Sequence, residues 1–188
     1  MPKVLAILVD GFEEIEAVTP IDLLRRAGVE VTIATLGDTR TVTGRCGIAL
    51  QGECSLGDAL SREPGGYDCL LLPGGPGVKT LRESTEVIKT VNQQHAAGRL
   101  VAAICAAPLV LLEAGILEGR RYTAHGSVVE ELPNTLPDEA VVVDGNLVTS
   151  RGAGTALQFG LTLAELIVGT DGAQRIAGEI HQMPDKGN

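Results

Sequence analysis

Cys105 is the residue of this sequence whose position is best suited to chemistry. It follows the short apolar run Leu100–Ile104 and precedes Ala106-Ala107-Pro108, where proline fits an early helix position. A thiol attacks as the thiolate, and a helix N-terminus lowers a cysteine pKa by pointing unpaired N–H groups at the sulfur. We therefore predict that Cys105 is a nucleophile with a lowered pKa at a strand-to-helix turn.

An oxyanion formed on an attacked carbonyl needs hydrogen-bond donors close by. The backbone N–H groups of Ala106 and of Gly75, in the turn Pro73–Gly77, are candidates for this oxyanion hole. The alternative interpretation is that Cys105 only packs, because cysteine is a small and often buried side chain. We assign packing to Cys69, which lies inside an apolar run at residues 67–72.

The four cysteines, at positions 46, 54, 69 and 105, show neither CxxC spacing nor a nearby histidine ligand pattern. The cysteine spacing thus predicts neither a metal site nor a redox dithiol. Cys46 and Cys54 could share one face of a hairpin, but disulfides are rare in a reducing compartment. We expect both to be free thiols, at the surface or in packing.

The apolar pattern predicts alternating strands and helices around the cysteine. Apolar runs predict buried strands at residues 3–9, 29–35, 67–72 and 100–104. Helical spacing predicts helices at residues 14–27, at 84–97 with Ser84 as the N-cap, and from Ala106 through Leu112. The interval between the first two strands requires a right-handed parallel crossover.

The remaining segments give weaker patterns. Residues 36–54 predict a small hairpin-like excursion at a sheet edge. Further along, we predict a strand near Tyr122, a short helix after Ser127, and a hairpin at 140–150 turned by Asp144-Gly145. A helix follows at 155–168. The tail is predicted to be helical from Thr170 to about Gln182 and to fray beyond it.

Strands that are apolar throughout and alternate with helices indicate an α/β fold, with a mostly parallel sheet and helices on both faces. We expect the 188 residues to form a single domain with one core. In such sheets, functional groups collect beyond the carboxyl ends of the strands. Asp10-Gly11, Pro73–Gly77 and Cys105 all fall there, so we expect them to meet.

Net charge and hydropathy indicate which classes of partner the protein does not bind. The formal net charge is −9, and the longest basic runs are the pairs Arg25-Arg26 and Arg120-Arg121, which argues against nucleic acid. The apolar run at residues 3–9 is too short for a membrane span and leads into Asp10 instead of a cleavage site. We predict a cytoplasmic protein with neither nucleic acid nor membrane as a partner.

Four motifs together resemble the ThiJ/PfpI family. They occur in the family's order and are Val9-Asp10-Gly11-Phe12-Glu13-Glu14-Ile15-Glu16, Leu72-Pro73-Gly74-Gly75, Ala102-Ala103-Ile104-Cys105-Ala106-Ala107-Pro108 and Thr149-Ser150-Arg151-Gly152-Ala153-Gly154-Thr155. Within the family, the sequence is most similar to the DJ-one branch, that of the parkinsonism-associated protein deglycase and its bacterial ThiJ-like relatives. The resemblance covers nearly the whole chain. It implies a single ThiJ/PfpI-type domain over residues 1–188, folded as a flavodoxin-like three-layer sandwich of the class I glutamine amidotransferase-like kind, and usually a homodimer.

The resemblance also implies roles for particular residues. Cys105 would lie at a strained nucleophile elbow beside a protonated glutamate from the first helix, which is Glu16 by motif position. Two acids so close cannot both ionise cheaply, which is a second reason to expect a low cysteine pKa. His125 matches the family's histidine near the cysteine and would shuttle a proton, and Arg151 matches an arginine that holds small anions at the pocket mouth. The alternatives are a satisfied polar role for His125 and a solvated surface role for Arg151.

Other charged residues have simpler interpretations. Glu13 and Glu14 suit the positive end of a helix dipole, and we assign them a structural role. His95 and His181 are assigned to the surface. Residues 44–47 depart from the branch, so no dimer or pocket contact is predicted from them.

The resemblance implies a cysteine-dependent, cofactor-free enzyme on reactive carbonyls or glycated amino groups, of the glyoxalase III-like or protein deglycase-like kind, which protects against carbonyl or oxidative stress. Cys105 would attack methylglyoxal to form a hemithioacetal, Glu16 and His125 would move protons, and water would release lactate. The alternative is a redox sensor or chaperone, in which peroxide converts Cys105 to a sulfinate held by protonated Glu16. A peptidase or amidase is disfavoured, because Ala106 stands where protease-like relatives often carry histidine.

Overall fold

Alternating strands and helices make up residues 1–37 and 39–182, the part of the chain that the computed structural model describes. The strands are β1 (Lys3–Leu8), β2 (Glu30–Thr35), β3 (Thr41–Thr43), β4 (Ala49–Gln51), β5 (Cys54–Ser55), β6 (Cys69–Leu72), β7 (Leu100–Ile104), β8 (Val141–Asp144) and β9 (Leu147–Ser150). The helices are α1 (Glu14–Arg26), α2 (Leu56–Arg62), α3 (Val78–Glu83), α4 (Thr85–Ala96), α5 (Pro108–Glu113), α6 (Ala156–Val168) and α7 (Thr170–Glu179), with short 3-10 helices η1 (Gly126–Val128) and η2 (Ala153–Thr155).

The main sheet has the strand order β5-β2-β1-β6-β7-β9-β8. Neighbouring strands pair in parallel, except that β8 is antiparallel to β9. The strand order changes direction at β1, because β2 lies on one side of it and β6 and β7 on the other. The carboxyl ends of β1, β6 and β7 therefore lie side by side at a topological switch point, where open α/β sheets form their ligand sites.

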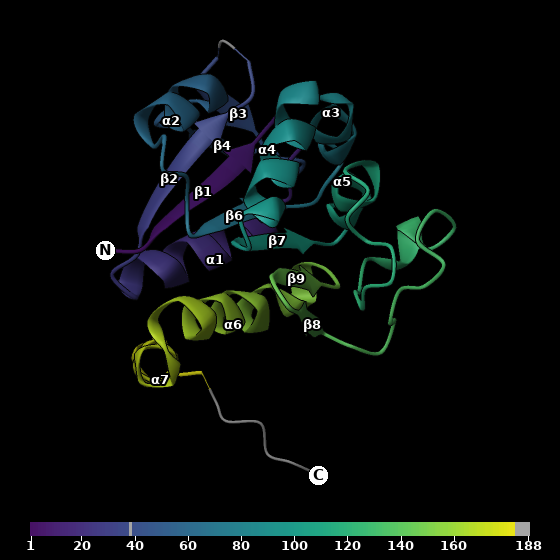
Figure 1. Cartoon of the computed structure of the whole chain (residues 1–188). Coiled ribbons are helices and arrows are strands. Elements are labelled where there is room, and N and C mark those ends of the chain that lie inside the picture. The colour runs from purple at the N-terminus through teal and green to yellow at the C-terminus, as the bar shows by residue number, and fades with distance from the viewer. Residues whose placement is uncertain (38, 183–188) are drawn as a thin grey trace.

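Both faces of the sheet are buried, which explains why its strands are apolar throughout. Leu5 and Ile7 pack into the core that includes residues of α2, α3, α4 and α5, whereas Val4 and Ala6 pack with residues of α1, α6 and α7. This alternation follows from the two-residue period of a strand. Figure 1 shows the three layers, with α1, α6 and α7 on one side of the sheet and the remaining helices on the other. The predicted α/β sandwich with a mostly parallel sheet is confirmed.

Most predicted elements are confirmed close to their expected bounds. Ser84 caps α4, since its Oγ accepts a bond from the Val87 N–H at 3.3 Å. The predicted excursion at residues 36–54 contains the antiparallel hairpin β3–β4 and the edge strand β5, although residue 38 is outside the described part. The helical tail is α7, while its predicted fraying falls on residues 183–188, which also lie outside the described residues.

The strand predicted near Tyr122 is wrong. This segment is extended and Tyr122 is buried, but it joins no sheet. Strand β9 already pairs with β7 on one side and β8 on the other, so it has no free backbone edge. The segment docks instead through a side chain, because the Thr123 N–H donates to Thr149 Oγ1 at 2.9 Å.

Two helices, α2 and α3, were not predicted from the sequence. The signal for α2 was present, because Ser55 Oγ accepts a bond from the Asp58 N–H at 3.1 Å and so caps the helix. Helix α3 is short and begins directly after the glycine-rich turn at residues 73–77, whose composition obscured it.

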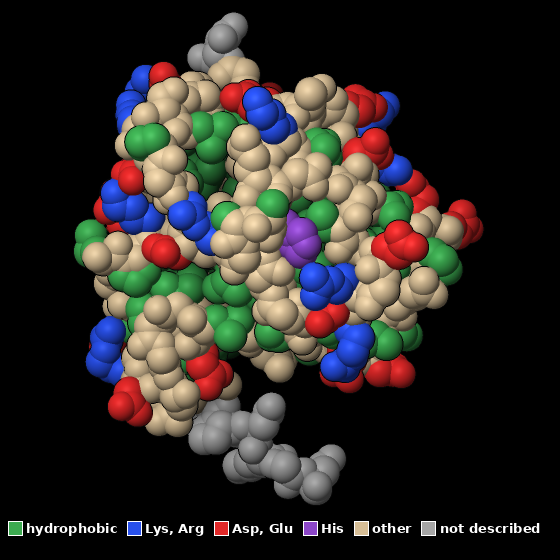
Figure 2. All heavy atoms as spheres, viewed as in Figure 1, with side chains coloured by type: hydrophobic (Ala, Val, Ile, Leu, Met, Phe, Trp, Pro, Cys, Tyr) green, Lys and Arg blue, Asp and Glu red, His purple; other side chains and the backbone are tan. Residues whose placement is uncertain are grey.

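The surface carries charges of both signs. On the face drawn in Figure 2, Lys and Arg side chains lie scattered among acidic side chains and exposed backbone, and do not merge into one basic area. Among the helices described, none is long and apolar enough to cross a membrane.

Candidate active site

The turn that carries Cys105 is strained and held from both sides. Cys105 has a φ of +66°, a left-handed conformation that costs a side-chain-bearing residue about 1–3 kcal/mol. Its N–H donates to the Ser150 carbonyl at 2.8 Å, and its carbonyl accepts a bond from the His125 N–H at 2.9 Å. This geometry agrees with the strained elbow that the family resemblance implies.

Glu16 reaches the cysteine from the first turn of α1. Its side chain is only 1% exposed, and Oε2 accepts a bond from the Gly74 N–H at 2.9 Å. The same carboxyl group is in hydrogen-bonding contact with the Cys105 thiol. Two loops and one helix thus bring the predicted acid and the predicted nucleophile together.

Burial makes these two acids compete for one proton. It raises the pKa of Glu16 from 4.5 to about 7, although bonds from the Cys105 thiol and the Gly74 N–H favour the carboxylate. Burial and the neighbouring Glu16 charge raise the pKa of Cys105 from 9.0 to about 12. The N–H groups of Ala106 and Gly75 oppose that rise, because they donate to the sulfur.

The predicted lowering of the Cys105 pKa is therefore wrong. Helix α5 begins only at Pro108 and is 6 residues long, so its positive end is weak and removed from the sulfur. The Glu16 carboxylate lies in direct contact and disfavours a second negative charge. A thiol that faces a carboxylate is the arrangement that this geometry favours at neutral pH.

The turn after β6 needs glycine to fit between the two acids. A Cβ on Gly74 would lie 2.5 Å from Glu16 Oε2 and 2.7 Å from Cys105 Cβ, both shorter than any real contact. Gly75 has a φ of +96°, which a residue with a side chain rarely adopts. Glycine at both positions lets the backbone N–H groups approach the acids directly.

His125 lies at the open side of the same site. Its side chain is exposed, and Nδ1 accepts a bond from the Ser127 N–H at 3.1 Å and lies 2.8 Å from Ser127 Oγ. Because Nδ1 accepts a bond, a neutral ring carries its proton on Nε2. A Cβ on Gly152 would lie 3.3 Å from the His125 Cδ2, so the ring packs against the start of η2.

A cavity of about 350 Å³ joins these groups. Its walls contain five of the six predicted site residues, and it is lined by Glu13, Glu16, Arg45, Gly75, Pro76, Cys105, Ala106, His125, Ser127 and Ala153. A larger cleft of about 720 Å³, between α3, α4 and α5, shares Gly75, Pro76 and Ala106 with it. The larger cleft lacks the nucleophile, so we place the chemistry in the smaller cavity.

Known proteins are similar to this chain over most of its length. A profile of the DJ-1/PfpI family matches residues 2–166. The chain belongs to the DJ-1/PfpI family. Protein dj-1beta of Drosophila melanogaster is 39% identical over 177 residues, which cover 92% of this chain and 93% of that protein. Its crystal structure gives a TM-score of 0.90 at 35% identity and covers 97% of this chain and 99% of the other.

Two further members of the DJ-1/PfpI family are similar over most of their length. Deglycase TK1284 of Thermococcus kodakarensis is 32% identical over 155 residues, which cover 81% of this chain and 91% of that protein. The oxidised form of Toxoplasma gondii DJ-1 gives a TM-score of 0.89 at 34% identity and covers 96% of this chain and 98% of the other. These likenesses establish the family and the flavodoxin-like fold of this chain.

Arg151 does not line the cavity of this DJ-1/PfpI protein. Its guanidinium is exposed and donates to the Pro137 carbonyl at 2.8 Å. The arginine at the cavity is instead Arg45, whose Nη1 lies 3.3 Å from Glu13 Oε2. Sequence reasoning missed it because residues 44–47 fit the family pattern poorly. The only local signal was an arginine in the loop of the predicted hairpin.

The remaining polar residues partly follow the predictions. The structural role assigned to Glu14 fits the geometry, because its Oε1 accepts bonds from the N–H groups of Cys46 at 2.8 Å and Ile48 at 3.3 Å. His181 is exposed as predicted, but the assignment of His95 to the surface is wrong, because this residue is partly buried and its Nδ1 is fully buried. Cys46 is an exposed free thiol, and the free thiols of Cys54 and Cys69 are buried in packing.

Proposed function

We propose that this chain is a cysteine-dependent, cofactor-free enzyme that converts methylglyoxal to lactate and acts on related glycated amino groups. The observation that carries the proposal is the contact of the Cys105 thiol with the buried Glu16 carboxyl group in an accessible cavity. A carboxyl group with a pKa of about 7 suits general base catalysis near neutral pH. The likeness to deglycase TK1284 supports the same reaction class.

In the first step, the Glu16 carboxylate accepts the Cys105 proton while the sulfur bonds to the aldehyde carbon of methylglyoxal. The electron pair of the C=O bond moves to the oxygen. The N–H groups of Ala106 and Gly75, which donate to the sulfur in the free protein, then stabilise this oxyanion. Glu16 then passes the proton to this oxygen. The result is a neutral hemithioacetal and a restored carboxylate.

In the second step, Glu16 removes the proton from the former aldehyde carbon, and the electron pair moves to the adjacent ketone oxygen, which His125 protonates. Return of the proton to the former ketone carbon gives a lactate thioester, and His125 recovers its proton from the remaining hydroxyl. Water hydrolyses the thioester, which releases lactate and restores the thiol. Oxidation of one carbon balances reduction of its neighbour, so the reaction needs no external oxidant.

The neighbouring cleft supports the extension to glycated amino groups. It opens beside Gly75 and Ala106 and offers about twice the volume of the reactive cavity. Its walls carry both signs of charge, since Arg82 forms ion pairs with Glu113 and Glu131 there. The amino acid or peptide part of an adduct would occupy this cleft while its carbonyl carbon faces Cys105.

The test is lactate formation from methylglyoxal by the purified protein, without glutathione or added metal, compared with the Cys105→Ser variant. We expect steady turnover by the wild type and a loss of at least about a thousandfold in the variant. Far-ultraviolet circular dichroism of both proteins controls for folding. A wild-type protein that makes no lactate, or a variant that keeps the rate, would contradict the proposal.

A second function, redox sensing or a chaperone role switched by oxidation, is favoured by the likeness to the oxidised Toxoplasma gondii DJ-1. Two equivalents of peroxide would convert the Cys105 thiol to a sulfinate, which a protonated Glu16 would hold by a hydrogen bond. Mass spectrometry after mild peroxide treatment measures this reaction. Gain of two oxygens at Cys105 in a protein that makes no lactate would make the sensor the leading function.

We also propose that residues 1–188 form a single domain that works as a homodimer in the cytosol. An apolar patch supports the dimer: Ile15, Val18 and Ile48 are 53%, 44% and 56% exposed, and Ile48 lies beside the start of α1 through its bond to Glu14. The free thiols support a reducing compartment. Peptide hydrolysis is disfavoured, since the residue that follows the nucleophile in the sequence is Ala106, where protease-like relatives often carry histidine.

A further inference from the structure

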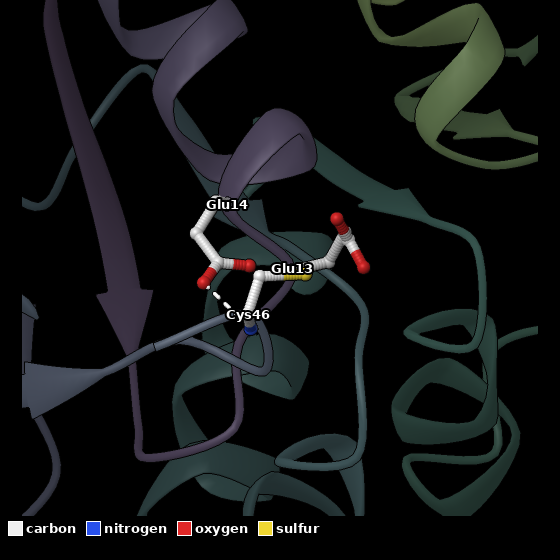
Figure 3. Close-up of side chains that lie close together, drawn as sticks. All are labelled: Glu13, Glu14 and Cys46. Carbon is white, nitrogen blue, oxygen red and sulfur yellow. Dashed lines mark hydrogen bonds between the residues drawn. The ribbon is translucent and has the colours of Figure 1, made fainter. Parts of the chain in front are cut away.

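A second group of reactive side chains lies beside the cavity and shares Glu13 with its wall. Glu13 and Glu14 stand at the start of α1, and Cys46 stands in the loop between β3 and β4. Figure 3 shows the three side chains close together, with the carboxyl groups of Glu14 and Glu13 on either side of the Cys46 sulfur. One ligand atom from each, two carboxylate oxygens and the Cys46 sulfur, lie within 4.8 Å of one another.

The Glu14 carboxylate provides an independent observation that points to a ligand. Its side chain is buried, with only 6% of the residue exposed, and Oε1 is occupied by the N–H groups of Cys46 and Ile48. Oε2 is also buried, and within the described residues it has no hydrogen-bond partner. Oε2 is therefore a buried polar oxygen that no N–H or O–H of the described residues satisfies. In Figure 3 this free oxygen is on the side of the Cys46 side chain.

We propose that Glu13, Glu14 and Cys46 bind a divalent cation of borderline softness, of which Zn²⁺ is the common biological example. Carboxylate oxygen and thiolate sulfur together suit zinc, whereas the sulfur excludes Mg²⁺ and Ca²⁺, which require oxygen ligands. Tetrahedral zinc, with bonds of about 2.0–2.3 Å, holds its ligand atoms about 3.5 Å apart. A small rotation of the exposed Cys46 side chain closes the site to that size.

The charges of the site balance in the bound state. Cys46 releases its proton to solvent when its sulfur bonds to the metal, so two carboxylates and one thiolate neutralise the divalent cation with one negative charge in excess. Arg45 now pairs with Glu13, and the cation competes with it for this carboxylate. In the single chain, where Cys46 is exposed, a water molecule takes the fourth position.

Sequence spacing could not reveal this site. Cys46 is separated from Glu14 by 32 residues, and they meet because the hairpin loop is bonded to the start of α1, through the N–H groups of Cys46 and Ile48 on the Glu14 carboxylate. The site also differs from the reactive centre, because neither Cys105 nor Glu16 contributes a ligand atom to it.

The experiment measures Zn²⁺ binding by competition with a chromophoric chelator, in a Cys105→Ser background so that the reactive thiol cannot bind metal. We expect one Zn²⁺ per chain, with binding at least about tenfold weaker when Cys46→Ser or Glu14→Gln is added. Glu14→Gln keeps an oxygen for the two N–H groups and removes only the charge and the free ligand oxygen. Glu118→Gln, at an exposed glutamate elsewhere, is the control for the change of net charge.

A second measurement identifies the sulfur ligand directly. Cd²⁺ added to the Cys105→Ser protein should give the ultraviolet charge-transfer band of a cadmium–thiolate bond, and Cys46→Ser should abolish it. Cys46 is exposed, so that variant will fold even if Glu14→Gln does not. No zinc binding in the Cys105→Ser background, or undiminished binding after Cys46→Ser, would overturn the proposal.

Discussion

The Cys105 and Glu16 side chains act as one unit with respect to protons. Glu16 is buried and Cys105 partly buried, and a charge on Glu16 raises the cost of ionising the thiol, so the pair loses its first proton with an apparent pKa that belongs to both. The geometry favours leaving the remaining proton on sulfur. The nucleophile is therefore a thiol that is deprotonated as it attacks, instead of a stable thiolate.

The left-handed conformation of Cys105 gives a prediction about stability. Glycine has no Cβ to strain at φ +66°, so Cys105→Gly should be more stable than Cys105→Ala by about 1 kcal/mol. For a chain of this size, that corresponds to a difference in Tm of about 2–4 °C. Differential scanning calorimetry of the two variants measures it. Both lose the thiol and leave Glu16 in the same surroundings, so each controls for the other, and equal or reversed Tm values would show that the elbow stores no strain.

Only some residues of the site could be predicted from the sequence. Cys105 could be predicted from its place between an apolar strand and a helix, and the family motif added Glu16 and His125. Arg45 and Cys46 could not be predicted, because they reach α1 through a hairpin whose pairing depends on long-range bonds. Burial of the sulfur and then the contact with Glu16 raise the pKa of Cys105, and no sequence pattern carries that information.

At the scale of elements, the strands that could be predicted from the sequence are those buried on both faces of the sheet. The strands β1, β2, β6 and β7 are apolar throughout because helices cover both faces of the sheet, and continuous apolar runs are easy to recognise. The hairpin of β8 and β9 was equally clear, from its Asp144-Gly145 turn. Tyr122 is buried for a different reason, since its segment docks beside β9, whose two backbone edges are already paired with β7 and β8.

The loops after β1, β6 and β7 explain why this sheet forms a site. The Gly11 carbonyl accepts a bond from the Gly77 N–H at 3.1 Å, and the Glu13 N–H donates to the Gly74 carbonyl at 2.9 Å. These bonds tie the start of α1 to the turn after β6. Glu16 is held against Cys105 by backbone structure, which a catalytic pair requires to keep its geometry.

At the scale of the whole molecule, the apolar patch of Ile15, Val18 and Ile48 predicts self-association. Ile15→Asp would bury a charge in the proposed interface and should convert the dimer to a monomer, because an unpaired charge there is costly. Size-exclusion chromatography with light scattering measures the mass, which should be twice the chain mass of 19.5 kDa for the wild type. Val129→Asp, at an exposed apolar side chain elsewhere, is the control and should stay dimeric. A wild-type protein of single-chain mass would rule out the dimer.

The most direct test of the whole account is the pH dependence of kcat/KM for methylglyoxal, measured from about pH 5 to about pH 9 for the wild type and Glu16→Gln. Glu16 must be ionised to accept the thiol proton, so the wild-type rate should rise with pH through about 7 and then stay level. The variant should lose that rise and at least about a hundredfold in rate. A wild-type rate that is already level near about pH 5 would mean that a preformed thiolate attacks, and an active Glu16→Gln protein would show that Glu16 is not the base.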